Sequence, residues 1–326
     1  RVLDACSGVG ILTPPRNWPM NQIDLLVMPA IATGCTMSLK PAELSPLAGM
    51  LFAKILHEAG VPAGVFNLLD GDGLGVGTGL SGHPDVAMIS FTGSSRAGIA
   101  ISKNAADSLK RVSLELGGKG ANIVFADAPK DAVAKGVARC FNNTGQSCNA
   151  PTRMLVERSR YDEAAEQAKA QAEHTKAAAA SENGAHTGPL VSKAQYDKVQ
   201  GLIKRGIEED GARLIAGGLG RPEGLERGFF VRPTIFADCH NDMITMQEEI
   251  FGPVMPVIGY DNFDEVINHI NANERPLAMY LFSNDSKLKK RLMNETSSGA
   301  ICVNETMVHA GQPNLPFGGV GNSGIG

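Results

Sequence analysis

The stretch that decides the fold runs from Thr36 to Leu69 and reads TMSLKPAELSPLAGMLFAKILHEAGVPAGVFNLL. It opens with the strand-like run 36–39 and closes with a second one, 65–69. Between them Ser45-Pro46 begins a helix that continues to Gly60, because serine suits an N-cap and proline suits the first helical turn. A strand, a helix and a strand at this spacing form a βαβ unit, which predicts a parallel sheet.

The same alternation continues on both sides of this unit. Before it, apolar residues recur at helical spacing up to Gly34, and Pro29 inside that pattern predicts a kink. After it, strand-like runs at 87–91 and 112–116 flank a helix that ends near Ser108. We therefore predict that residues 1–116 form a doubly wound, Rossmann-like α/β domain.

The second half repeats this style from Gly117 onward and predicts a second α/β domain over residues 117–326. The expected strands are 121–125, 152–156, 254–258, 279–282 and 300–304. Residues 161–180 predict an alanine-rich helix that faces solvent, and Ser192 with Gln195 predicts a capping box. The predicted fold class is thus α/β, with two doubly wound open-sheet domains.

The composition excludes several classes of protein. The chain has 326 residues, 43% hydrophobic and 20% charged, with a net charge of −4, so we expect no nucleic-acid surface. Its apolar runs stay below the roughly 18–20 residues of a membrane span, and its first residues lack the layout of a secretory leader. We therefore expect no membrane association.

The cysteines and histidines indicate reduced thiols and no metal site. Six cysteines are scattered along the chain without a C-x-x-C pair, which does not suit a disulfide framework or a zinc site. The seven histidines have no ligand-type spacing. These patterns favour a cytoplasmic protein without a bound metal.

One cysteine is placed as a nucleophile would be. Residues 141–148 read FNNTGQSC, so Cys148 ends a turn rich in glycine, asparagine and threonine between a predicted helix and a predicted strand. Loops on a rigid scaffold present reactive groups in this way. A buried, unreactive thiol is the alternative, and these eight residues alone favour it, because free cysteine is among the most buried residue types.

Seven motifs in order give the chain a resemblance to the NAD(P)-dependent aldehyde dehydrogenase superfamily, covering nearly its whole length. They are Asn17-Trp18-Pro19, Leu39-Lys40-Pro41-Ala42-Glu43, Phe91-Thr92-Gly93-Ser94, Leu114-Glu115-Leu116-Gly117-Gly118-Lys119, Gly145-Gln146-Ser147-Cys148, Glu248-Glu249-Ile250-Phe251-Gly252-Pro253 and Pro316-Phe317-Gly318-Gly319. The resemblance implies oxidation of a small-molecule aldehyde to an acid with a nicotinamide cofactor.

The resemblance also implies catalytic roles. Cys148 would attack the aldehyde, and hydride transfer from the adduct would leave a thioester. The Asn17 side chain and the backbone N–H of Cys148 would stabilise the oxyanion. Glu115 would activate the water that hydrolyses the thioester, and its presence favours a free acid over acyl transfer to coenzyme A.

The cofactor contacts follow from the same resemblance. A carboxylate at Glu43, near the ribose, would repel a 2′-phosphate, so we expect NAD in preference to NADP. Gly93 and Ser94 lie at a strand-to-helix turn, which suits the pyrophosphate. The complete set of implied cofactor contacts is Lys40, Glu43, Gly93, Ser94, Glu249 and Phe251.

Some features depart from the family pattern. Pro15-Arg16 stands where the family carries one aromatic residue before the asparagine. The chain also resembles a fragment whose cofactor domain is incomplete, from a parent that forms a homodimer or homotetramer. Two other readings therefore remain open: a thiol esterase or acyltransferase that shares Cys148 and Glu115, and a truncated, non-catalytic relative.

Overall fold

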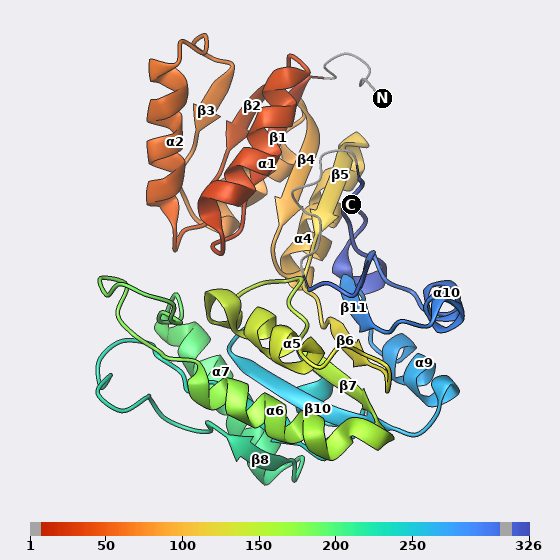
Figure 1. The fold of residues 1–326 in the computed structure, drawn as a ribbon. Coiled ribbons are helices and arrows are strands. Elements are labelled where there is room, and N and C mark those ends of the chain that lie inside the picture. Colours follow the sequence, from red (N-terminus) through yellow and green to blue (C-terminus); the bar gives the residue numbers. More distant parts are fainter. Residues whose placement is uncertain (1–7, 307–314) are drawn as a thin grey trace. The chain divides into compact units, whose positions relative to one another are not determined.

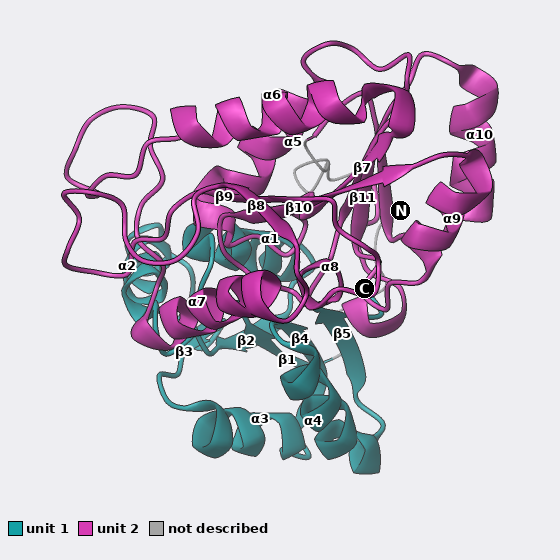
Figure 2. Ribbon diagram, turned by 90° about the horizontal axis from the view of Figure 1, so that it is seen from below, with its two compact units in different colours: residues 1–116, 324–326 teal, residues 117–323 magenta. Residues whose placement is uncertain are grey.

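The computed structural model describes residues 8–306 and 315–326 and divides the chain into two compact units (Figure 2). Unit 1 is Arg1–Leu116 with Gly324–Gly326, and unit 2 is Gly117–Ser323. Each unit contains its own sheet with helices on both faces, which confirms the predicted fold class. Residues 1–7, where the sequence lacks a leader pattern, lie outside the described residues.

Unit 1 has a five-stranded parallel sheet with the strand order β3-β2-β1-β4-β5. The order reverses between β1 and β4, and the crevice at such a switch point is where open α/β sheets bind ligands. Its elements are β1 (Val9–Thr13), α1 (Pro19–Ala32), β2 (Thr36–Leu39), α2 (Pro46–Glu58), β3 (Phe66–Leu68), the π-turn Gly73–Gly77, α3 (Thr78–Gly82), β4 (Val86–Thr92), α4 (Ser95–Ala105), a 3₁₀ turn (Ala106–Ser108) and β5 (Arg111–Glu115).

Both faces of this sheet are buried. Ile23 of α1 and Phe52 of α2 pack with Met37 of β2 in one cluster, and Ala105 of α4 packs with Ile89 of β4 in another. Short apolar strands between amphipathic helices suit such a two-sided burial. The last residues of the chain belong here too, because an antiparallel bridge joins Gly324 to Glu115 beside β5.

Unit 2 has a seven-stranded sheet with the order β12-β11-β6-β7-β10-β9-β8, in which only β8 is antiparallel (Figure 1). Its elements are β6 (Ala121–Val124), α5 (Ala132–Phe141), a 3₁₀ turn (Asn142–Gly145), β7 (Arg153–Glu157), a 3₁₀ turn (Arg158–Arg160), α6 (Tyr161–His174), α7 (Lys193–Glu208), β8 (Arg213–Ala216), β9 (Thr234–Ala237), α8 (Ile244–Gln247), β10 (Val254–Tyr260), α9 (Phe263–Asn271), β11 (Ala278–Phe282), α10 (Ser286–Glu295), β12 (Ala300–Val303) and a 3₁₀ turn (Gly321–Ser323).

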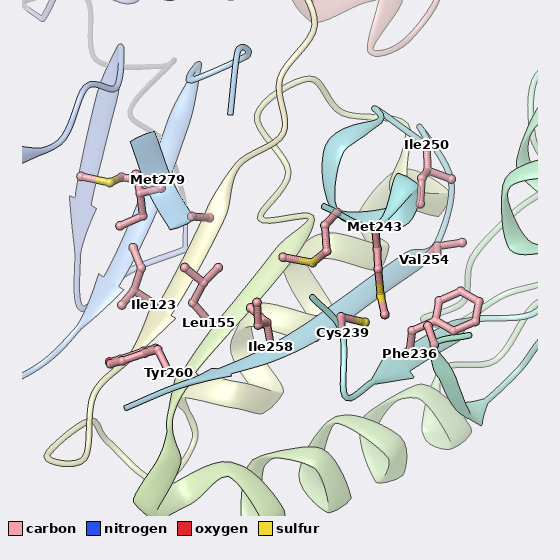
Figure 3. Packing of buried hydrophobic residues seen from close by; sticks show 14 of the residues in the cluster. Ile123, Leu155, Phe236, Cys239, Met243, Ile250, Val254, Ile258, Tyr260 and Met279 are labelled. Atoms are coloured by element: carbon pink, nitrogen blue, oxygen red, sulfur yellow. The ribbon is translucent and has the colours of Figure 1, made fainter. Parts of the chain in front are cut away.

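The core of unit 2 lies on the two faces of this sheet. Figure 3 shows one face, where Ile123, Leu155, Ile258 and Met279 of four neighbouring strands pack together. The opposite face is covered by α5 and α6, which pack against each other and against the same strands. Since successive residues of a strand point to opposite faces, strands buried on both sides are apolar almost throughout.

Some elements differ from the sequence-based expectation. The helix at 161–180 is shorter and is not solvent-exposed all round: α6 ends at His174 and buries Ala164, Ala168 and Ala172 against α5. Alanine gives little hydrophobic contrast, so its pattern does not show which face is buried. The sequence also does not reveal β8 and β9, which are four residues each.

Candidate active site

In unit 1, the predicted site residues follow the carboxyl ends of parallel strands. Asn17 comes after β1, Lys40 after β2 and Gly93-Ser94 after β4, while Glu115 is the last residue of β5. Since β1, β2, β4 and β5 are parallel, these ends share one edge of the sheet. The motifs that are distant in sequence are therefore presented on a common edge within this unit.

Lys40 and Glu43 face a glycine-rich turn. Gly73 donates its N–H to Glu43 Oε1 at 2.6 Å, and Lys40, whose side chain is buried, donates Nζ to the Pro41 carbonyl at 3.0 Å. The Lys40 chain also lies along Gly77, where an added Cβ would come 3.8 Å from its Cε. The two charged side chains are thus fixed beside a backbone that carries few side chains.

Gly93 and Ser94 connect β4 to α4. Ser94 is the N-cap of this helix, and its hydroxyl accepts a hydrogen bond from the N–H of Ala97 at 3.3 Å. Gly93 donates its N–H to the Glu115 carbonyl at 3.0 Å, and a Cβ at Gly93 would come 2.4 Å from the ring of Phe91. A helix N-terminus reached through a glycine is a suitable place for an anion.

Asn17 is half-buried in the bend between β1 and α1. The next residue, Trp18, is the helix N-cap and adopts a left-handed conformation with φ of 53°. This conformation is unusual for a bulky residue and reflects the tight entry into α1 after Pro14-Pro15 and Arg16. The structure thus places Asn17 at a sharply constrained corner of the chain.

Glu115 is half-buried, and its Oε2 atom is buried without a hydrogen-bond partner among the described residues. Burial raises the pKa of this carboxyl from 4.5 to about 7, because it disfavours the charged form. A carboxylate with a pKa near neutrality is suited to take a proton from water. The sequence could not reveal this property, since it depends on burial.

In unit 2, the predicted site residues precede the amino ends of two neighbouring strands. Cys148 comes before β7, and Glu249 and Phe251 come before β10. Because β7 and β10 are parallel and directly paired, these residues lie at one edge of the sheet. The proposed nucleophile and the proposed nicotinamide contacts are therefore brought to the same edge.

The segment that carries Cys148 has an uncommon backbone. Asn143 and Thr144 have φ angles of 51° and 57°, and Gly145 continues in the same region at 72°. Such conformations cost about 1–3 kcal/mol for a residue like threonine, so the surroundings must hold them. Thr144 donates its hydroxyl to the Gly188 carbonyl at 2.9 Å, and the N–H of Val191 donates to Gln146 Oε1 at 3.0 Å.

Gly117 and Gly118 lie between the turn that carries Cys148 and the side chain of Glu249. A Cβ on Gly118 would come 2.2 Å from the Cys148 carbonyl, and one on Gly117 would come 2.4 Å from Glu249 Oε2. The N–H of Gly118 also donates to Glu249 Oε1 at 3.1 Å, and burial raises the pKa of Glu249. Glycine is required here because the backbone passes between the cysteine turn and this carboxyl group.

Helix α7 holds the segment 249–251 with two side chains that the sequence did not single out for this purpose. Lys198 donates Nζ to the Glu249 carbonyl at 2.7 Å, and Gln195 donates Nε2 to the carbonyls of Ile250 and Phe251 at 3.1 and 3.0 Å. The Ser192 hydroxyl accepts from the N–H of Gln195, as expected of an N-cap. The capping pattern correctly placed Gln195 in the first turn but did not show where its side chain reaches.

Lys119 lies next to this site as a buried amine. It is 1% exposed, and its Nζ has no hydrogen-bond partner among the described residues. Burial, assisted by the charge of Arg153, lowers the pKa of Lys119 to about 7. An unpartnered buried polar group of this kind destabilises the fold.

We expect Lys119→Met to raise the free energy of unfolding at about pH 7 by roughly 1–3 kcal/mol, because methionine needs no hydrogen bond. The native amine is neutral above about pH 7 while the unfolded one keeps its proton, so the wild type gains stability as the pH rises. The advantage of the variant therefore shrinks toward about pH 10, as urea titrations at both values would show. Lys135→Met, on the exposed side of α5, is the matched control, and an equal gain there would contradict the explanation.

Residues 8–306 and 315–326 offer neither a metal site nor a membrane-spanning helix. Within these residues, histidine, cysteine, aspartate and glutamate form no group of three or more that could hold a metal ion. No helix among them is long and apolar enough to cross a membrane. The five cysteines in this part of the chain all carry thiols.

Comparison with known proteins gives one consistent result. A sequence model described as "Aldehyde dehydrogenase family" matches residues 3–326. A 3-succinoylsemialdehyde-pyridine dehydrogenase of Pseudomonas sp is 46% identical over 327 residues, covering 100% of this chain and 68% of that protein. A putative aldehyde dehydrogenase of Staphylococcus haemolyticus is 46% identical and covers 98% of this chain and 66% of its own length.

Solved structures agree with these sequences. The crystal structure of an aldehyde dehydrogenase from Bartonella henselae has a TM-score of 0.94 and 53% identity, covering 98% of this chain and 66% of that one. A cysteine-to-alanine mutant of Aldehyde Dehydrogenase C from Pseudomonas syringae, in complex with NAD+ and octanal, has a TM-score of 0.95 and 43% identity, covering 99% and 66%. The chain thus spans about two thirds of the length of the relatives that it matches.

Proposed function

This chain belongs to the aldehyde dehydrogenase family, and on that premise we propose that the protein oxidises an aldehyde to a carboxylic acid with NAD. In this proposal Cys148 is the nucleophile, Glu115 is the general base and Asn17 stabilises the oxyanion. Two observations support the reaction class. One relative is named as a semialdehyde dehydrogenase, and the Pseudomonas syringae structure is a complex with NAD+ and octanal.

One observation carries the proposal. Gly117-Gly118 packs against both the carbonyl of Cys148 and the carboxyl group of Glu249, and it follows Glu115 in the chain by only two residues. Consecutive Cα atoms are at most about 3.8 Å apart, so this connection limits how far the base can lie from the edge that bears the nucleophile. In the proposed mechanism the base acts on the thioester through one water molecule.

The residues of the chain can perform each protein-based step. The Cys148 thiolate adds to the carbonyl carbon, forming a C–S bond, while the carbonyl electron pair moves to the oxygen. The Asn17 amide and the backbone N–H of Cys148 donate to that oxygen and stabilise its charge. After oxidation leaves a thioester, Glu115 takes a proton from water, and the resulting hydroxide displaces the Cys148 thiolate to release the acid.

The residues present fit an NAD molecule. Unit 1 offers the switch point between β1 and β4, a helix N-terminus at Ser94 and a glycine turn beside Lys40 and Glu43. In unit 2, the Glu249–Phe251 segment lies at the edge that bears Cys148 and would hold the nicotinamide riboside. When bound, the cofactor supplies the acceptor for the hydride that leaves the adduct.

We expect Glu43→Gln to reduce the preference for NAD over NADP roughly tenfold, since removing one like charge near a 2′-phosphate is worth about 1–2 kcal/mol in partly screened surroundings. Glutamine keeps an oxygen that can accept from the N–H of Gly73, so the turn should be preserved. The ratio of kcat/KM for the two cofactors measures the effect. An unchanged ratio would exclude Glu43 as the selecting residue.

The direct test incubates this chain with NAD or NADP and each of a panel of aldehydes, including octanal. Absorbance measures the NADH or NADPH that forms, and product analysis measures the acid. Aldehyde-dependent NADH formation that requires Cys148 supports the proposal. Ester cleavage by Cys148 without any need for a nicotinamide would instead identify a thiol esterase or acyltransferase. A folded chain that neither reacts nor binds NAD in calorimetry would identify a non-catalytic fragment.

A further inference from the structure

Two side chains that the proposed mechanism leaves unused converge on Asn149, the residue after Cys148. Tyr280, on β11, donates its hydroxyl to the backbone carbonyl of Asn149. Arg139, in the last turn of α5, donates Nη2 to the side-chain Oδ1 of Asn149 at 3.4 Å. Asn149 is therefore held both by its backbone and by its side chain, from two different elements of unit 2.

Asn149 matters because it shares a tight turn with Cys148. The N–H of Ala150 donates to the Ser147 carbonyl at 3.2 Å and closes a turn whose two central residues are Cys148 and Asn149. Their backbone angles are linked by this closure, so fixing Asn149 restricts the angles open to Cys148. On its other side, the turn is limited by Gly118 against the Cys148 carbonyl.

Arg139 and Tyr280 are themselves well fixed. Tyr280 is fully buried, and Arg139 is half-buried with its Nε donating to the Thr306 carbonyl at 3.1 Å. Burial raises the pKa of Tyr280, so its hydroxyl stays protonated and remains a donor. Tyr280 lies within electrostatic range of Arg139, Cys302 and Cys148, so these groups share one neighbourhood of unit 2.

We propose that Arg139 and Tyr280 are positioning residues that act through Asn149 to hold the Cys148 thiol in one orientation, with the guanidinium charge favouring the thiolate. A cation near a cysteine stabilises the thiolate, which is the reactive form. The inference rests on the nucleophilic role proposed for Cys148. Its test measures the thiol directly, without cofactor or aldehyde.

The test is alkylation of the intact chain with iodoacetamide across a range of pH, with each cysteine followed separately by peptide mass spectrometry. Arg139→Met is expected to slow alkylation of Cys148 about tenfold near neutral pH and to move the midpoint of its pH profile upward. Arg139→Lys keeps the charge without the planar fork, so the midpoint should stay near the wild-type value. Tyr280→Phe is expected to slow the reaction about threefold without moving the midpoint, because it removes only a hydrogen bond.

The matched control is Arg160→Met, because Arg160 also donates to a backbone carbonyl, that of Ala128 at 2.8 Å, but follows the far end of β7. Cys35 in unit 1 serves as an internal reference for general loss of structure. Wild-type rates and midpoints in Arg139→Met and Tyr280→Phe would overturn the proposal, as would an equal effect of Arg160→Met. If NADH formation does not need Cys148, the proposed function fails, while the alkylation profile still reports whether the thiol is positioned.

Discussion

Cys148→Ser is expected to abolish aldehyde-dependent NADH formation, with a loss of at least about 10⁴-fold in kcat, since removing a catalytic nucleophile commonly costs more than that. A serine hydroxyl stays protonated at neutral pH, so it cannot add to the carbonyl as the thiolate does. The adduct from which hydride leaves would then not form. Initial rates of NADH formation at saturating cofactor measure the loss.

The control is Cys35→Ser, because Cys35 is the other partly exposed cysteine among the described residues. NAD binding by calorimetry should be unchanged in Cys148→Ser, since the turn that carries this residue is held by its neighbours Thr144, Gln146 and Asn149. Substantial NADH formation by Cys148→Ser, with Cys35→Ser equally active, would refute the assignment of the nucleophile.

Glu115→Gln is expected to separate the two halves of the reaction. Oxidation can still occur once, so a burst of about one NADH per site should precede a steady rate that is lower by roughly 10²–10⁴-fold, the usual contribution of a general base. Glutamine cannot take the proton of the attacking water, and the acyl group would remain on Cys148. Rapid-mixing kinetics and intact-protein mass spectrometry would detect the burst and the acylated enzyme.

The same residue sets the expected pH dependence. Burial raises the pKa of Glu115 to about 7, and only its ionised form is a base, so thioester hydrolysis should increase as the pH rises through about 7. In Glu115→Gln this rise should disappear from the hydrolysis step. Glu58→Gln, an exposed carboxylate on α2, is the control. A wild-type burst and pH profile in Glu115→Gln would contradict the role of the base.

The parts of the fold that follow from local patterns were predictable. Thr36–Leu39 is a strand with the predicted bounds, and α2 begins at Pro46 after Ser45 as expected, because cap residues and apolar spacing act locally. The four-residue strands β8 and β9 were not predictable, since each has too few residues to show a period. Their pairing depends on contacts between segments that are distant in sequence.

The site, like the fold, has features that local sequence predicts and features that only the folded chain shows. Motifs indicated Cys148, Glu115 and the cofactor contacts, whose roles remain predictions, but the raised pKa of Glu115 and the packing of Gly117-Gly118 required the folded chain. Arg139 was hidden for a different reason. On an amphipathic helix an arginine in the last turn is typical of a solvated face, and only the structure shows that it reaches Asn149.

The pairing of residues 324–326 with β5 bears on how unit 1 unfolds. The backbone passes from unit 1 to unit 2 after Leu116 and returns after Ser323, so unit 1 is not one continuous segment. Ile325 and Gly326 donate to the Leu114 carbonyl at 3.1 and 3.3 Å, and a Cβ on Gly324 would lie 1.9 Å from that oxygen. Residues 324–326 thus pair with the strand that bears Glu115. Residues 324–326 are joined to β5 in the chain through the segment 117–323, so we expect unfolding of that segment to loosen the strand end that carries Glu115, the proposed general base.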